Sequence, residues 1–81
     1  MKVIVEKSYR KSFWKLERWT QIKVHEKLKS LEFRPNIPNV KKLTNFSPNL
    51  RLRVWDYRIL FDIVDDEVIV SDVKHRKDIY K

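Results

Sequence analysis

The sequence contains no glycine and no cysteine in its 81 residues. Without glycine, every turn that needs a positive φ angle must use asparagine, aspartate or a costlier residue. A glycine-rich phosphate-binding loop is excluded, and with it the P-loop and Rossmann classes of nucleotide-binding protein. The absence of cysteine excludes disulfides, thiolate metal sites and cysteine nucleophiles. We therefore expect a protein of a reducing, cytoplasmic compartment.

Long hydrophobic runs are also missing. No stretch approaches the roughly 20 apolar residues that a membrane span needs, and the apolar run near the start is too short for a signal peptide. We expect no membrane association. The length predicts a single domain over residues 1–81, with one small core and no deep enclosed cavity.

Positive charge is abundant, with 19 lysines and arginines against 11 acidic residues and a net charge of +8. Hydrophobic residues still make up 42% of the chain, which is enough apolar surface to favour a folded domain over a disordered one. The charge balance points to an anionic partner.

Apolar periodicity in the first 32 residues predicts a strand and two helices. The apolar run in residues 2–7 is typical of a strand buried on both faces. Ser8 is a candidate N-cap for a helix that ends near Trp19, and Thr20 is a candidate N-cap for a second helix. Each helix has an apolar stripe at i, i+4, i+7 spacing, formed by Tyr9, Phe13 and Leu16 and by Val24, Leu28 and Leu31.

Residues 34–49 hold all three prolines of the chain, so this segment cannot be one regular element. Within it we expect one turn through Val40 and Leu43, which leaves Lys41 and Lys42 in solvent.

From Leu50 onward the apolar period changes to two, which predicts three strands separated by turns at residues 55–56 and 65–67. The residues expected on the core face are Leu50, Leu52, Val54, Tyr57, Ile59, Phe61, Ile63, Ile69 and Val73. The predicted fold class is α+β, a two-helix hairpin packed on one face of a small, mainly antiparallel four-stranded sheet in the order β-α-α-β-β-β.

The opposite face of this sheet carries cations. Strand parity places there Arg51, Arg53, Arg58, Lys74 and Arg76. Basic residues on an exposed strand face often serve only solubility. Here, however, their mutual repulsion lowers folding stability unless an anion relieves it, and guanidinium groups bind phosphate in a bidentate manner. A ribose-phosphate backbone is the natural ligand.

Metal-free cleavage of RNA needs a base for the ribose 2′-OH, an acid for the leaving oxygen and cations for the phosphate. Tyr80 is a candidate base because nearby guanidinium groups favour the phenolate, although a terminal tyrosine can also simply dock on the surface. His75 suits acid-base work, or it faces the core in a structural role, because it shares strand parity with Val73. His25 has no second ligand nearby, and we expect no metal or cofactor.

Two segments, LRVWDYRILFDIVDD at residues 52–66 and VKHRKDIY at residues 73–80, resemble the RelE/ParE toxin superfamily. The first segment is similar to the arginine-rich hairpin and the acidic turn of that family. The second is similar to its last strand, in which a His-Arg pair is followed by a tyrosine. Residues 41–43 resemble its upstream lysine-leucine pair, and the order of elements agrees over nearly the whole chain.

The resemblance implies a RelE-like toxin of a toxin-antitoxin operon, which cuts messenger RNA in the ribosomal A site without a metal and leaves a 2′,3′-cyclic phosphate. Carried over by position, the implied catalytic residues are Arg58, Arg76 and Tyr80, with His75 as the alternative base. The implied RNA-binding residues are Arg51, Arg53, Lys41, Lys42 and Lys74.

The implied partners are mRNA, the ribosome and an acidic antitoxin that adds a strand or lays a helix in a groove, with operator DNA reached only through the antitoxin. A ParE-like inhibitor that binds DNA gyrase, without nuclease activity, is the alternative, and a simple nucleic-acid-binding domain is the third possibility.

Two positions depart from the family pattern. Trp55 and Lys74 stand where the family usually has glycine. Because a bulky residue at positive φ is strained, we expect that Asp56 takes the left-handed conformation instead or that the loop is displaced. The longer Lys74 side chain adds charge that suits RNA, and it could also fill the site.

Overall fold

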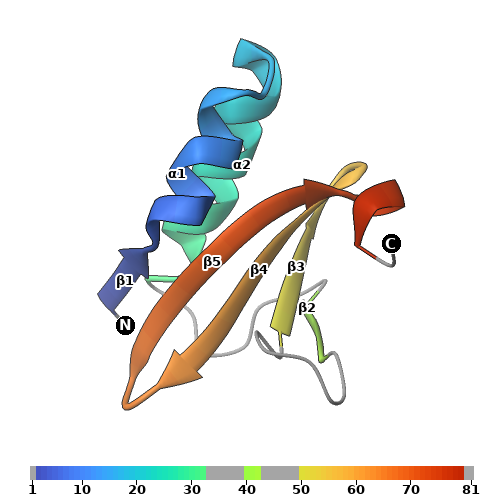
Figure 1. Ribbon diagram of the computed structural model, residues 1–81. Helices are drawn as coiled ribbons and strands as arrows, with labels where there is room; N and C mark the ends of the chain where they lie inside the picture. The colour runs from blue at the N-terminus through green and yellow to red at the C-terminus, as the bar shows by residue number, and fades with distance from the viewer. Residues whose placement is uncertain (1, 33–39, 43–49, 80–81) are drawn as a thin grey trace.

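Two helices lie on one side of a curved β-sheet in the computed structural model (Figure 1). The structure describes residues 2–32, 40–42 and 50–79. In chain order the elements are β1 (Lys2–Val5), α1 (Lys7–Trp14), α2 (Arg18–Ser30), β2 (Val40–Lys42), β3 (Leu50–Val54), β4 (Tyr57–Val64), β5 (Glu67–His75) and the short 3₁₀ helix η1 (Arg76–Asp78). Among these described elements, no helix is long and apolar enough to cross a membrane.

The strand order in the sheet is β1-β5-β4-β3-β2. Strand β1 pairs with β5 in parallel, and every other neighbouring pair is antiparallel. The predicted fold class is therefore confirmed, with β2 as an additional short strand. The turn expected through Val40 and Leu43 is wrong in its described part, because Val40–Lys42 forms backbone pairs with β3. This pairing gives the outer edge of β3 hydrogen-bond partners. Leu43 lies outside the described residues.

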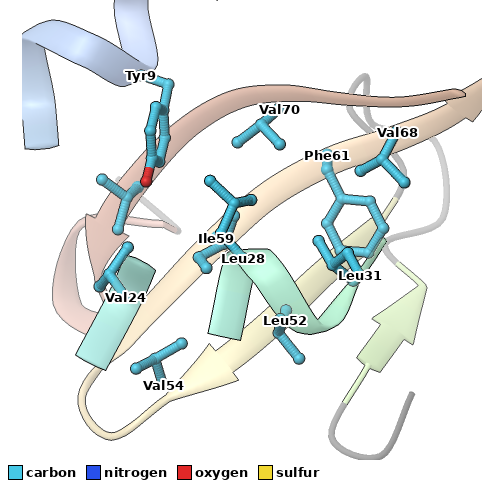
Figure 2. Packing of buried hydrophobic residues seen from close by; sticks show 11 residues of the cluster. Tyr9, Val24, Leu28, Leu31, Leu52, Val54, Ile59, Phe61, Val68 and Val70 are labelled. Atoms are coloured by element: carbon cyan, nitrogen blue, oxygen red, sulfur yellow. The ribbon is translucent and has the colours of Figure 1, made fainter. Parts of the chain in front are cut away.

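The core lies between the helix pair and the sheet (Figure 2). Its buried hydrophobic side chains are Tyr9, Val24, Leu28, Leu31, Leu52, Val54, Ile59, Phe61, Val68, Val70 and Val73. Both predicted helix stripes contribute, since Phe13 and Leu16 pack against this cluster as partly buried residues. Burial of this apolar area is the main favourable term that holds the two layers together.

A bulge at Ser71 changes which side of β5 faces the core. Leu60 pairs with Asp72 while the next residue, Phe61, pairs with Val70, so Ser71 has no partner on β4. One extra residue reverses the alternation of a strand. The prediction that Ile69 faces the core is therefore wrong.

The start of α1 satisfies the polar groups of this bulge. The Ser71 hydroxyl donates to Glu6 Oε1 at 2.8 Å, and the Ser71 carbonyl accepts a hydrogen bond from the Ser8 hydroxyl. Ser8 thus bonds to β5 and is not the N-cap of α1, whose N-cap residue is Glu6.

The helix boundaries differ from the predicted ones. Helix α1 ends at Trp14, five residues before the expected end at Trp19. Gln21 Nε2 of α2 donates to the carbonyl of Phe13 at 3.1 Å, which satisfies a backbone oxygen in the last turn of α1. Helix α2 begins at Arg18, so Thr20 is a buried residue within the helix and not its cap.

Two strand predictions overestimated burial. Strand β1 lies at the edge of the sheet and its apolar residues are only half-buried. Ile63 is 45% exposed, although Ile59 and Phe61 of the same strand are buried. Ile63 lies next to the last residue of β4, close to the β4–β5 turn, and this turn projects away from the helix pair (Figure 1).

Asp65 and Asp66 form the β4–β5 turn with φ angles of 50° and 63°. A two-residue hairpin turn with both central residues at positive φ usually contains glycine or asparagine. In a chain without glycine, aspartate tolerates this conformation at a small cost because its short side chain is one of the few found there. The predicted charged turn is confirmed at Asp65 and Asp66, whereas Glu67 is already the first residue of β5.

Replacement of Ile59 and Ile63 by alanine separates buried from exposed positions on one strand. We expect Ile59→Ala to lower the free energy of unfolding by about 2–5 kcal/mol, because Ile59 is fully buried. The same change at the exposed Ile63 is expected to cost less than about 1 kcal/mol. Urea denaturation measures both, and equal losses would contradict the burial described for β4.

Alkaline pH provides a test of the Tyr9 environment. Burial raises the pKa of the Tyr9 hydroxyl to about 12. The unfolded chain releases this proton near pH 10 whereas the native protein keeps it, so stability falls as the pH rises from 10 to 12. We expect the free energy of unfolding of Tyr9→Phe to fall less than that of the wild type over this pH range, by about 1–2 kcal/mol, with allowance for solvent screening. Urea denaturation of both proteins at pH 9 and pH 11.5 measures the difference, and parallel losses would contradict it.

Candidate functional site

A row of three cations crosses the sheet on the face opposite the helices. Arg53 on β3 is directly opposite Arg58 on β4, and Arg58 is directly opposite Lys74 on β5. Directly opposed residues of antiparallel strands share a face and have neighbouring Cβ atoms, so these like charges repel one another. The predicted grouping by strand parity is thus reproduced in the backbone register for Arg51, Arg53, Arg58 and Lys74, whereas Arg76 lies in η1 beyond the end of β5.

Arg58 lies at the centre of the positive charge. Burial of its guanidinium lowers its pKa, and the charges of Arg53, Arg51 and Arg76 lower it further, while Asp56 opposes the shift. We call these residues, Arg51, Arg53, Arg58 and Arg76, the arginine cluster. The cluster forms a strongly positive surface on which an anion would be stabilised.

The backbone of the β3–β4 turn holds Arg58 in place. Its Nη1 atom donates hydrogen bonds to the carbonyl of Trp55 at 2.8 Å and to that of Tyr57 at 2.9 Å. Both acceptors belong to the same tight hairpin, so the guanidinium is oriented before any ligand arrives.

Asp56 connects the end of β5 to the same turn. The backbone N–H of Arg76 donates to the Asp56 carbonyl at 2.6 Å, and Arg76 Nε lies 3.7 Å from Asp56 Oδ1. Figure 1 shows η1 beside this turn. The ion pair is largely exposed and contributes little energy, so the backbone hydrogen bond is the main link that positions Arg76. The sequence assigns Asp56 only to the turn, because no local pattern relates it to Arg76.

Trp55 itself adopts the left-handed conformation, with φ of 55°. Of the two expectations for this turn, a left-handed Asp56 is therefore wrong, since the described residues with positive φ are Trp55, Asp65 and Asp66. The hairpin keeps a two-residue turn, in which Val54 pairs with Tyr57 and Arg53 with Arg58. The Trp55 ring packs against Trp19 of α2, with ring centroids 6.2 Å apart, and this contact helps to offset the backbone strain.

His75 does not share the face of the arginine cluster. Its ring makes an edge-to-face contact with Tyr57 at a centroid distance of 5.2 Å, and Tyr57 packs against the core. Its Nδ1 atom accepts a hydrogen bond from the Lys77 backbone at 3.2 Å and caps η1. The structure therefore places His75 on the same side of the sheet as Tyr57, with its Nδ1 atom engaged at the start of η1.

For the predicted site residues Lys41 and Lys42, the structure gives only the place in the strand register. Lys41 is the register partner of Arg51, and Lys42 is the register partner of Leu50. Tyr80 lies outside the described residues. Across the described ranges 2–32, 40–42 and 50–79, no group of three potential metal-ligating side chains occurs.

The fold is similar to that of chains in three solved toxin-antitoxin complexes. The toxin-antitoxin complex of Methanococcus jannaschii matches with a TM-score of 0.80 and 21% identity, over 96% of this chain and 95% of the other. The archaeal RelE-RelB complex of Pyrococcus horikoshii matches with a TM-score of 0.78 and 24% identity, over 95% and 96%. RelBE2 of Mycobacterium tuberculosis matches with a TM-score of 0.76 and 25% identity, over 93% and 96%.

The sequence also matches a family model. Residues 3–80 fit the model of the ParE toxin of the type II toxin-antitoxin system parDE. The chain belongs to this family of toxins, within the RelE/ParE superfamily. No curated protein sequence matches the chain significantly.

Removal of one charge from the arginine cluster tests its repulsion. We expect Arg53→Gln to raise the free energy of unfolding by about 0.2–1 kcal/mol at low salt, because Arg53 directly opposes Arg58. The gain should vanish in 1 M salt, which screens the charges. Arg10→Gln is the matched control, because Arg10 is exposed on α1 and does not affect the pKa of Arg58. An equal gain in both variants would show that only net charge matters.

Proposed function

We propose that this toxin is a metal-independent endoribonuclease that cleaves mRNA on the ribosome, in the cytoplasm. The observation that supports this most strongly is the arginine cluster, in which the guanidinium groups of β3, β4 and η1 act on one another. A scissile phosphate gains negative charge as it becomes pentavalent, and fixed cations stabilise that charge.

In this mechanism the ribose 2′-oxygen attacks the adjacent phosphorus. The bond between O2′ and phosphorus forms while the bond between phosphorus and O5′ breaks, which gives a 2′,3′-cyclic phosphate and a free 5′-hydroxyl. Tyr80 takes the proton of the 2′-OH as a phenolate, and the departing 5′-oxygen takes a proton from water. Arg58 and Arg76 bind the phosphate, and Arg51, Arg53 and Lys74 bind the neighbouring RNA backbone, together with Lys41 and Lys42.

Tyr80 is a better candidate base than His75. The imidazole of His75 contacts Tyr57 and accepts a hydrogen bond at Nδ1, on the face away from Arg58. Tyr80 is four residues beyond Arg76, whose backbone is anchored to Asp56. A positive environment favours the phenolate form that abstraction of a proton requires.

The proposal includes two kinds of partner. The ribosome positions the mRNA, because a shallow surface orders a substrate poorly without help. An antitoxin neutralises the toxin, as the solved complexes of similar fold each contain an antitoxin. The net charge of +8 favours an acidic antitoxin and fast, salt-sensitive association. Operator DNA would be contacted only through the antitoxin.

A translating extract tests the nuclease proposal by primer extension on a defined mRNA. We expect Tyr80→Phe to slow cleavage by about 100- to 10,000-fold, as for loss of a general base, and Arg58→Ala by about 100- to 1,000-fold. Arg10→Ala, on the exposed side of α1, should cleave like the wild type. The proposal fails if both Tyr80→Phe and Arg58→Ala cleave at the wild-type rate.

A gyrase inhibitor is the second candidate, favoured by the match to the ParE family model. A supercoiling assay with purified DNA gyrase distinguishes it from the nuclease. Inhibition of supercoiling without any mRNA cleavage, with or without ribosomes, would assign the toxin to gyrase. Cleavage at mapped codons with normal supercoiling would assign it to mRNA.

A further inference from the structure

Apart from Arg53, the residues that line a groove near the arginine cluster have no part in the mechanism above. The groove lies between α2 and the β3–β4 hairpin, has a volume of about 380 Å³, and is lined by Lys23, Glu26, Lys27, Arg53, Val54 and Trp55. This volume is within the usual range for sites that bind a small organic group. Arg53 is common to both surfaces, because it lines the groove on the α2 side of the hairpin and belongs to the arginine cluster on the other face of the sheet.

The charge of the groove favours an anionic ligand. Three of its lining residues are cationic, namely Lys23, Lys27 and Arg53, and one is anionic. Glu26 is within 3.7 Å of Lys23, which reduces the negative contribution of its carboxylate.

Trp55 presents an aromatic wall with a fixed orientation. Its side chain is 50% exposed, yet its backbone has the left-handed conformation that a bulky residue rarely adopts. The Trp19 ring packs against it, and the Lys23 ammonium lies 6.0 Å from its ring centroid. A strained residue whose neighbours hold it in place, at the edge of a charged surface, is a common feature of binding sites.

We propose that this groove binds one nucleobase of the RNA substrate, stacked on Trp55, next to the phosphate held by the arginine cluster. The inference rests on the proposed nuclease function and adds a specific subsite to it. Stacking on an aromatic ring accepts any base because every base has a π-face. The cationic rim binds the flanking phosphates.

Binding of uncleavable RNA tests the subsite. The probes are a 2′-O-methyl adenosine hexamer and an abasic 2′-O-methyl hexamer, which carry the same phosphates and lack the 2′-OH nucleophile. We expect the wild-type toxin to bind the adenosine hexamer about 10- to 100-fold more tightly than the abasic one. Fluorescence anisotropy measures both affinities.

Three variants separate stacking from other effects. Trp55→Gly removes the indole and suits the positive φ, so we expect it to fold and to bind both hexamers equally. Trp55→Tyr retains an aromatic face and should restore most of the preference. Trp14→Phe is the control, because Trp14 is a 73% exposed tryptophan that does not line the groove.

Several outcomes would overturn the subsite. The first is equal binding of the two hexamers by the wild type. The second is a preference for the adenosine hexamer that survives in Trp55→Gly. The third is that the toxin binds neither hexamer and instead binds a hexaglutamate peptide in a manner that depends on Trp55. Because the probes cannot be cleaved, the result is independent of nuclease activity. Cleavage of mRNA together with equal binding of the two hexamers would refute only the subsite, and tighter binding of the adenosine hexamer without any cleavage of mRNA would refute only the proposed function.

Discussion

Repulsion between like charges at the β3–β4 hairpin is the constraint on which the site depends. Arg53 and Arg58 are directly opposed in the register, and the neighbouring guanidinium groups lower the pKa of Arg58. Backbone carbonyls of the turn accept hydrogen bonds from Arg58, and Asp56 anchors Arg76. The protein thus gives up some folding stability to keep these cations together, and a bound polyanion would restore it.

The absence of glycine affects the same hairpin. The β3–β4 and β4–β5 turns both contain residues at positive φ, and the two turns meet this need differently. Asp65 and Asp66 tolerate the conformation by themselves, whereas Trp55 is supported by a ring contact with Trp19 and by the Lys23 ammonium. The contact of Trp55 with Trp19 and Lys23 holds the start of α2 against the hairpin, and the basic groove lies between them. A single costly turn therefore connects the fold to a candidate binding surface.

Alternation and helical spacing predicted most of the fold because they are local properties of the backbone. The helical period of 3.6 accounts for the buried stripes, which include Tyr9, Val24, Leu28 and Leu31. The strand period of 2 accounts for the alternation of Leu52 and Val54 with Arg51 and Arg53. The same argument failed at Ile69, because the bulge at Ser71 reverses the alternation. It failed at Ile63 because exposure depends on whether a helix covers that end of the sheet, and strand parity carries no such information.

The sequence by itself determined the two-layer α+β class, the sheet face of the arginines and the resemblance to RelE/ParE toxins. Tertiary structure alone decided three features: the bond between Arg76 and Asp56, the choice between the two orientations that the sequence left open for His75, and the Trp19–Trp55 contact. Each involves residues about 20 or more positions apart. Such contacts depend on the register of the hairpins and on how the helices pack across the sheet, and no pattern within one segment specifies either.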